Sequence, residues 1–141
     1  MSLAPAAEQR IRASFSAQGM MHTLGAELTV LEPGHAVIEA PLRAQTAQQH
    51  GAGHAGLAFS IGDSAAGYAA LTGLPEDREV MTSEMKIHLL APALGTHLTA
   101  DGRVVKAGRR LIVVSASVYA WNAGERRQVA LLLGTMVPVA P

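Results

Sequence analysis

One short segment of the chain carries the groups that chemistry at a carbonyl carbon requires. The triplet His54-Ala55-Gly56 stands where a helix is expected to begin, and Asp63 is the only charged residue in the following apolar stretch. The first turn of a helix presents backbone N–H groups at the positive end of its dipole, and these stabilise negative charge on a carbonyl oxygen. A carboxylate attacks carbon or takes a proton from water. Ala55, Gly56 and Asp63 are therefore candidate catalytic groups; the structural alternative is a buried Asp63 bonded to a strand hydroxyl.

The spacing of these groups predicts that two chains build one site. Ala55 and Asp63 are eight residues apart, which in a helix is about 12 Å along the axis and about 80° around it. Both groups must lie within about 3 to 3.5 Å of one carbonyl to act together. One chain cannot place them so. We therefore expect a homodimer whose two helices run antiparallel, with two sites related by a two-fold axis.

A helix over residues 55–72 would be apolar on every face, because the segment contains small and apolar residues apart from Asp63. That pattern is typical of a helix enclosed by other structure. Gly62 and Gly67 each cost roughly 1 kcal/mol relative to Ala inside a helix, which indicates that another backbone packs close to them. The run is shorter than the roughly 20 residues of a membrane span and has an acid near its centre, so no membrane partner is expected.

The rest of the sequence predicts one more helix and an antiparallel sheet. We expect a helix over about residues 5–21 and strands over residues 26–31, 35–40, 81–89, 97–106, 109–121 and 126–137. In residues 81–89 the alternation assigns Met81, Ser83 and Met85 to a core face and Thr82 to a polar face. No linker or repeat divides the chain. The sequence predicts a single α+β domain over residues 1–141, with the sheet wrapped around the central helix.

Composition excludes several classes of function. Lys plus Arg equals Asp plus Glu at 11 each, so net charge gives no indication of nucleic acid as a partner. The absence of cysteine excludes disulfides, a thiolate nucleophile and a cysteine metal site. His50 and His54 have no third ligand at useful spacing, and neither a metal nor another cofactor is expected. The first residues lack a basic region followed by an apolar one, so we expect no signal peptide and a cytoplasmic location.

The segments around Asp63 resemble the hotdog-fold acyl-CoA thioesterases of the PaaI type. The motifs that carry the resemblance are His54-Ala55-Gly56 with an acid nine residues after the histidine, Ser64-Ala65-Ala66-Gly67-Tyr68-Ala69, Thr82-Ser83-Glu84-Met85-Lys86-Ile87 and Ala91-Pro92-Ala93-Leu94-Gly95. It runs from about Gly25 to Val137. It implies that the N–H of Ala55 forms the oxyanion hole, that Asp63 is nucleophile or general base, and that Gln48 helps place the thioester or the water. Ala55 departs from the usual glycine but keeps its N–H.

Other residues complete the expected site. His54 either orients substrate or caps the helix, and either Thr82 or Ser83 reaches Asp63 from the adjacent strand. A basic group near the Ala107-Gly108 turn is a candidate for holding coenzyme A phosphates, the alternative being a solvated hairpin tip. It consists of Arg103, Lys106, Arg109 and Arg110.

The expected activity is hydrolysis of a small or medium acyl-CoA, with aromatic acyl groups included among the candidates. The expected enzyme is a homodimer, and two such dimers form a homotetramer. The tetramer follows from the resemblance and from the apolar content of 49%. Two alternatives remain open at this stage. One is a hotdog acyl-thioester dehydratase or hydratase, and the other is an acyl-CoA binding protein without turnover.

Overall fold

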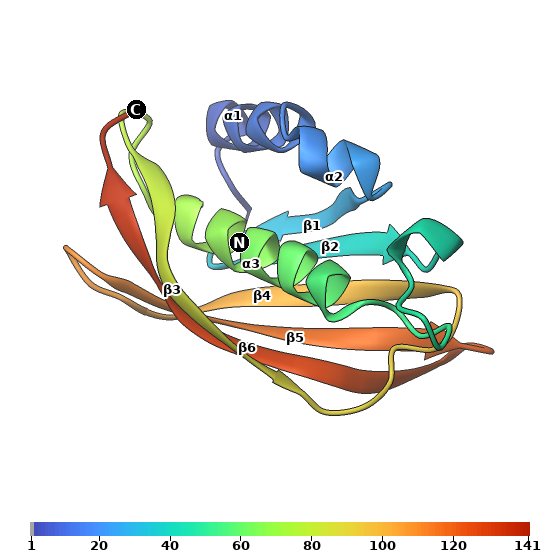
Figure 1. The fold of residues 1–141 in the computed structure, drawn as a ribbon. Coiled ribbons are helices and arrows are strands. Elements are labelled where there is room, and N and C mark those ends of the chain that lie inside the picture. Colours follow the sequence, from blue (N-terminus) through green and yellow to red (C-terminus); the bar gives the residue numbers. More distant parts are fainter. Residues whose placement is uncertain (1) are drawn as a thin grey trace.

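The computed structural model describes residues 2–141 and shows a six-stranded sheet that curves around a central helix (Figure 1). Met1, the first residue of the domain expected over residues 1–141, lies outside the described residues. The helices are α1 (Pro5–Ser16), α2 (Gly19–Thr23) and α3 (Ala55–Leu71), with a 3-10 turn at Ala44–Thr46. The strands are β1 (Glu27–Glu32), β2 (His35–Pro41), β3 (Glu79–Leu89), β4 (His97–Ala107), β5 (Ile112–Asn122) and β6 (Glu125–Val139).

The strands follow the order β1-β2-β4-β5-β6-β3, and every neighbouring pair is antiparallel. The expected α+β architecture, an antiparallel sheet wrapped around one apolar helix, is therefore confirmed. Strand β5 begins at Ile112 rather than at Arg109, because residues 108–111 form a loop closed by the N–H of Gly108 bonding to the carbonyl of Leu111 at 2.9 Å. Strands β1 and β3 are the edges of the sheet, and within the described residues each has a strand neighbour on one side only.

Helix α3 is enclosed because it is largely apolar, and ten of its seventeen residues are buried. Its close approach to the sheet is made possible by Gly102 on β4, where an added Cβ would overlap the backbone of Ala65. The expectation that another backbone packs against Gly62 and Gly67 is wrong. An added Cβ at Gly62 would meet the side chain of Leu132 at 2.9 Å, and at Gly67 the nearest atom would be 3.7 Å away. The required glycine therefore lies on the strand and not on the helix.

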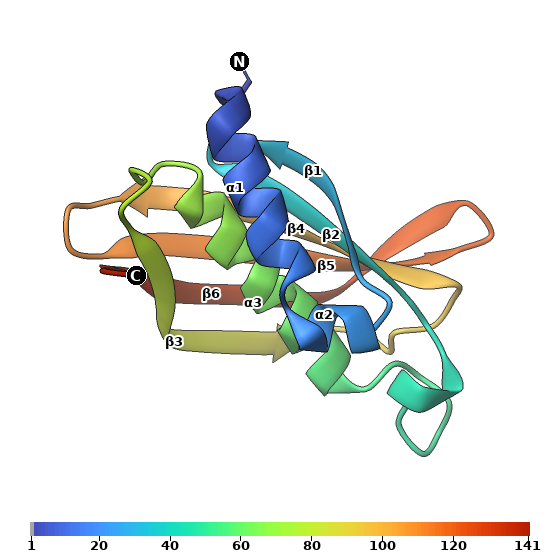
Figure 2. The same ribbon diagram turned by 90° about the horizontal axis from the view of Figure 1, so that it is seen from above.

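The N-terminal segment covers α3 on the side away from the sheet, and α1 crosses over α3 in the view from above (Figure 2). The single helix expected over residues 5–21 is wrong, because α1 ends at Ser16 and α2 begins at Gly19. Gln18 has extended backbone angles between them, and its side chain donates to the hydroxyl of Tyr68 at 2.7 Å. The break therefore turns Gln18 toward α3, and Gly19, a poor helix former, marks the restart.

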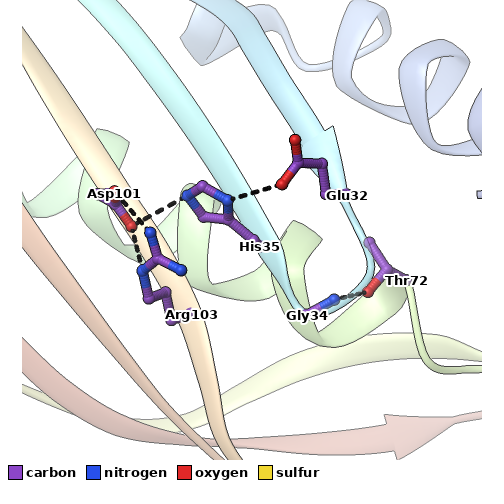
Figure 3. Close-up of polar contacts among 6 residues, drawn as sticks. All are labelled: Glu32, Gly34, His35, Thr72, Asp101 and Arg103. Carbon is purple, nitrogen blue, oxygen red and sulfur yellow. Dashed lines mark hydrogen bonds and ion pairs between the residues drawn. The ribbon is translucent and has the colours of Figure 1, made fainter. Parts of the chain in front are cut away.

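A polar cluster joins three strands on the sheet face opposite α3 (Figure 3). The ring of His35 on β2 lies between Glu32, with Nδ1 3.4 Å from Oε2, and Asp101, with Nε2 3.2 Å from Oδ1. Arg103 also approaches Asp101, with Nε 2.9 Å from Oδ1. Arg103, one of the expected phosphate ligands, is thus engaged with Asp101 within its own strand.

The end of α3 is tied to the turn between β1 and β2 by Thr72 (Figure 3). The Thr72 hydroxyl accepts from the N–H of Gly34 at 2.8 Å and donates to the carbonyl of Ala69 at 2.7 Å. It therefore satisfies one of the carbonyls that the end of a helix leaves free. Among residues 2–141, no helix is both long and apolar enough to cross a membrane.

We expect Thr72→Val to lower the free energy of unfolding by about 1 to 2 kcal/mol, because it leaves the N–H of Gly34 without a partner. Thr72→Ser keeps the hydroxyl and should cost less. Urea unfolding at one protein concentration measures both. Equal losses in the two variants would show that the methyl group, and not the hydrogen bond, carries the effect.

Candidate active site

The start of α3 presents one free backbone N–H. His54 is the N-cap residue, and its Nδ1 accepts from the N–H of Gly56 at 2.8 Å. Of the two proposed roles for His54, capping is the one that the geometry supports. The N–H of Ala55 makes no hydrogen bond to any of residues 2–141. Ala55 therefore offers a free N–H at this helix start, whereas the N–H of Gly56 is already occupied by the cap.

A pocket of about 410 Å³ opens at this helix start. Gln48, His54 and Ala55 contribute its polar groups. The rest of its wall comes from Ala52 and Gly53 before α3, Ala58 on α3, Val129 on β6, and residues 89–93 at the end of β3 and in the loop after it. The Gln48 side chain lies in the wall with its Oε1 accepting from the N–H of His50. Gln49 is exposed and lies outside this pocket. Of the two neighbouring glutamines, Gln48 is thus the one placed beside Ala55.

Asp63 lies on the same helix but faces a different environment. Its carboxylate is half-buried, and its Oδ1 accepts from the hydroxyl of Thr82 at 2.7 Å. Burial raises the pKa of Asp63 above its ordinary value near 3.8, and the hydrogen bond from Thr82 opposes part of that rise. Burial and a single donor are a poor environment for a purely structural carboxylate. The hydrogen bond from Thr82 fixes the carboxyl group, which can still accept further hydrogen bonds from another partner.

A β-bulge in β3 turns Thr82 toward Asp63. The pairing of β3 with β6 shifts between Thr82 and Glu84, which leaves Ser83 as the extra residue. Before the bulge, Thr82 faces α3; after it, Met85 faces the core. The expectation that Met81, Ser83 and Met85 share a core face is therefore wrong for the first two, since Met81 is 62% exposed and Ser83 is also exposed. A strict alternation has no means of representing the inserted residue.

Asp63 opens into its own pocket of about 230 Å³ between α3, α1 and the start of β3. Four lining residues, Ser14, Gln18, Tyr68 and Glu79, were not among the site residues expected from the sequence. Gly67 follows Asp63 by four positions, so helical periodicity places it near the acid, whereas Tyr68, at five positions, lies about 140° around the helix from Asp63. No local signal indicated that α1 would fold across this part of α3.

The two pockets share no lining residue, although β3 reaches both. Its first residues, Glu79, Val80 and Thr82, line the Asp63 pocket, whereas Leu89 at its end lines the pocket at the start of α3. Thr82 and Leu89 are seven positions apart, which in a strand is about 24 Å. In one chain the free N–H of Ala55 and the carboxylate of Asp63 therefore belong to separate cavities.

The expected basic group is divided by the structure. Arg109 and Arg110 line a depression of about 430 Å³ together with Arg78, which was not part of the basic group expected from the sequence. Lys106 is exposed on β4 and does not line it, and Arg103 is engaged with Asp101. Arg78 joins this depression because the chain returns to the sheet after α3. Among residues 2–141, no three His, Asp or Glu side chains gather in an arrangement suited to a metal ion.

Comparison with known proteins gives one matching family model, that of the thioesterase superfamily, over residues 50–125. A solved thioesterase family protein of Silicibacter pomeroyi superposes with a TM-score of 0.93 and 38% identity, covering 96% of this chain and 99% of that one. The PaaI protein of the phenylacetic acid degradation operon of Escherichia coli superposes with a TM-score of 0.86 and 26% identity, covering 99% and 97%. The hotdog fold implied by the sequence motifs is thereby confirmed.

A curated relative extends this similarity to the archaea. A Saccharolobus solfataricus protein named "putative esterase" is 33% identical over 114 residues, which are 81% of this chain and 73% of that protein.

We expect Asp63→Asn to raise the free energy of unfolding at neutral pH. Because the pKa of Asp63 is raised in the fold, folding favours the neutral carboxyl group. The stability from this shift is present below the unfolded-state pKa and is lost as the pH rises through the folded-state pKa. Asn is neutral throughout and keeps an oxygen for the Thr82 hydroxyl.

The gain of Asp63→Asn over the wild type should therefore shrink as the pH falls. Urea unfolding at a series of pH values measures it, with Glu76→Gln, an exposed acid in the turn after α3, as the control. A gain that does not depend on pH, or no gain at neutral pH, would contradict this account of Asp63.

Proposed function

The chain belongs to the thioesterase superfamily and is a thioester hydrolase, and we propose that it hydrolyses small or medium acyl-CoA thioesters at a site shared by two chains. The observation that carries this proposal is that α3 has both a free N–H, that of Ala55, and a half-buried carboxylate, that of Asp63. These are the two groups that thioester hydrolysis requires. The name of the E. coli neighbour, which refers to phenylacetic acid degradation, favours aromatic acyl groups among the substrates to be tested.

The proposed reaction uses Ala55 and Asp63 on opposite sides of the same thioester carbonyl. In the general-base route, Asp63 takes a proton from water, the water oxygen bonds to the carbonyl carbon, and the negative charge on the carbonyl oxygen is stabilised by the N–H of Ala55. Collapse of the tetrahedral intermediate breaks the carbon–sulfur bond, and the proton held by Asp63 passes to the departing thiolate, which releases coenzyme A thiol and the acid. In the nucleophilic route, Asp63 bonds to the carbon and displaces coenzyme A thiolate, and water then hydrolyses the resulting anhydride. Gln48 is placed to orient the carbonyl or the water.

The proposed dimer brings the two groups together through β3. This strand is a sheet edge, and it lines the Asp63 pocket at its start and the Ala55 pocket at its end. If β3 pairs with the same strand of a second copy about a two-fold axis, the start of one strand faces the end of the other. Leu89 and Leu90 beside the Ala55 pocket are 59% and 55% exposed in one chain, which fits a surface that a second copy covers.

We propose that Arg78, Arg109 and Arg110 hold coenzyme A phosphates, because Arg78 directly precedes Glu79 of the Asp63 pocket. The homotetramer stays a prediction supported by the outward-facing Leu131 and Leu133 of β6, which are 38% and 52% exposed. The cytoplasmic location also stays a prediction.

We expect thiol release from at least one member of a panel of short, medium and aromatic acyl-CoAs. Asp63→Ala should lower kcat/KM at least about 10²-fold, because it removes the base or nucleophile. Size-exclusion chromatography and circular dichroism show whether the variant keeps its fold and assembly. If a folded variant retains more than about a tenth of wild-type activity, Asp63 is structural. Hydration of an enoyl-CoA without thiol release by any member would favour the dehydratase.

A second prediction concerns the shared site. Asp63→Ala chains refolded together with Gln48→Ala/Ala55→Pro chains should regain activity, since each mixed dimer has one intact site. Proline at position 55 removes the N–H and is tolerated there, because Ala55 is the first residue of α3. Random pairing gives about a quarter of wild-type activity, as half the dimers are mixed and each has one working site of two.

The matched control mixes Asp63→Ala with Asp63→Asn chains, which carry damage in the same half-site and should not recover. Mixed dimers are identified by a mass tag on one chain. No recovery in the first mixture despite tagged mixed dimers would mean that each site is built within one chain. Recovery in the control would mean that activity does not depend on Asp63, which would contradict its proposed role.

A further inference from the structure

An arginine of the N-terminal helix reaches across to the start of β3. Arg10 lies on α1, and its Nη1 donates to the carbonyl of Arg78 at 3.2 Å. The same Nη1 is 3.8 Å from the Oε1 of Glu79, the first residue of β3. Arg10 therefore contacts the junction between the depression that Arg78 lines and the pocket that Glu79 lines. Because it lines neither of them, any effect of Arg10 on a substrate passes through these two neighbours.

Arg78 lies outside the helices and strands, in the turn between α3 and β3, and it is exposed. Both of its backbone polar groups are bonded. Its N–H donates to the carbonyl of Pro75 at 3.1 Å, and its carbonyl accepts from Arg10. The first of these bonds is internal to the turn, whereas the second joins the turn to α1. Arg10 therefore helps to fix where the turn, and with it the Arg78 guanidinium, lies on the protein.

The other two arginines of the depression are held in a different way. Arg109 and Arg110 belong to the loop before β5, which the bond between Gly108 and Leu111 closes internally. The depression of about 430 Å³ thus forms where this loop and the turn at Arg78 come together. Its remaining wall is apolar and consists of Leu74, Pro75, Val137 and Pro138. Three guanidinium groups beside an apolar wall suit a nucleotide with several phosphates, provided that the turn holds Arg78 against the loop.

Charge at the junction gives Arg10 a second effect on a bound phosphate. Glu79 follows Arg78 directly, and its carboxylate opposes an anion that binds at Arg78. Arg10, 3.8 Å from that carboxylate, offsets its charge in part. Two further acids of the turn, Glu76 and Asp77, are exposed and do not line the depression. Loss of Arg10 would therefore increase the negative charge beside the depression.

The placement of the Arg10 side chain has a cost in stability. Its Nε is buried and has no hydrogen-bond partner within residues 2–141. A buried donor without a partner is destabilising, and an apolar side chain of similar length would pack there without that cost. Stability alone therefore does not account for a guanidinium at this position, whereas its contacts with Arg78 and Glu79 do.

We propose that Arg10 is a positioning residue for coenzyme A, which holds Arg78 where the phosphates bind and offsets the charge of Glu79. This inference rests on the proposed thioesterase function and on the phosphates binding at Arg78, Arg109 and Arg110. The competing role of Arg10 is structural, as a brace between α1 and β3. The two roles differ in the coenzyme ratio, which is kcat/KM for an acyl-CoA divided by kcat/KM for the corresponding acyl-pantetheine.

The experiment compares two substrates that differ only in the nucleotide. Acyl-pantetheine has the same acyl group, thioester and pantetheine arm as acyl-CoA, but it lacks the nucleotide and every phosphate. The acyl group is that of the best substrate in the acyl-CoA panel, and thiol release measures both reactions. For wild-type enzyme we expect a coenzyme ratio of about ten or more, and Arg78→Met should lower it about tenfold by removing a phosphate ligand.

Arg10→Met removes the guanidinium and keeps a flexible apolar stem. It should lower the coenzyme ratio about three- to tenfold, mainly through KM for the acyl-CoA, because it frees the turn at Arg78. Arg10→Lys keeps the charge and a donor, and should restore part of the loss. In the double variant Arg10→Met/Arg78→Met the ratio should fall little further than in Arg78→Met alone, since the residue that Arg10 positions is gone.

Arg12→Met is the matched control. Arg12 lies on the same helix, donates to the backbone carbonyl of Leu28 at 3.1 Å and pairs with Glu8 at 3.0 Å. Its loss removes the same charge and a similar brace from α1, so it should slow both substrates by the same factor. Circular dichroism and size-exclusion chromatography show which variants keep their fold and assembly. Arg10→Gln replaces Arg10→Met if the Met variant does not fold.

Equal losses for the two substrates in Arg10→Met would overturn the positioning role and leave the brace. A fall of the coenzyme ratio by the same factor with and without Arg78 would also overturn it, because Arg10 would then act without Arg78. An unchanged ratio in Arg78→Met would show that the phosphates bind elsewhere and would overturn this inference while leaving the thioesterase function. Failure of the wild type to release thiol from any thioester would instead overturn the proposed function, and this inference with it.

Discussion

The sheet curves around α3 because this helix is apolar on every side and has to be enclosed. Gly102 allows β4 to approach the backbone of Ala65 without a clash, and α1 closes the remaining side. The enclosure is incomplete at the first turn of α3 and around Asp63 beside the edge strand β3. The burial that stabilises the fold therefore also decides where substrate reaches the helix.

The rigidity of α3 then sets the limit on catalysis. Its first N–H and its carboxylate are fixed about 12 Å apart along the axis by helix geometry, and they open into cavities that share no residue. No side-chain rotation removes that separation. Because β3 lines both cavities from opposite ends and is a sheet edge, a two-fold pairing of this strand is the simplest arrangement that joins them. The proposed dimer is required because Ala55 and Asp63 of one chain cannot act on the same carbonyl. Assembly of dimers into a tetramer is not required for the proposed reaction.

Much of this could be predicted from sequence, and the failures have identifiable physical causes. The limits of α3 were predictable because apolar composition, the N-cap position of His54, and Gly73 and Pro75 just after the helix are local signals. The bulge at Ser83 was not, since it depends on how β3 pairs with β6, and it reverses which side chains face Asp63. The break before Gly19 depends on the contact between Gln18 and Tyr68, and Arg78 joins Arg109 and Arg110 only through tertiary structure. Local patterns located the candidate catalytic groups, whereas the residues that line the pockets around them could be identified only from the fold.

The central claim is that Ala55 of one chain and Asp63 of another act on one carbonyl. The most direct measurement is a crystal structure of the protein with an acyl-CoA analogue in which a methylene group replaces the thioester sulfur, so that the carbonyl remains but cannot be hydrolysed. The account predicts a carbonyl oxygen about 3 Å from the N–H of Ala55 in one protomer, with the carbonyl carbon facing Asp63 of its partner. A carbonyl that contacts Ala55 and Asp63 of the same protomer, or neither of them, would contradict it.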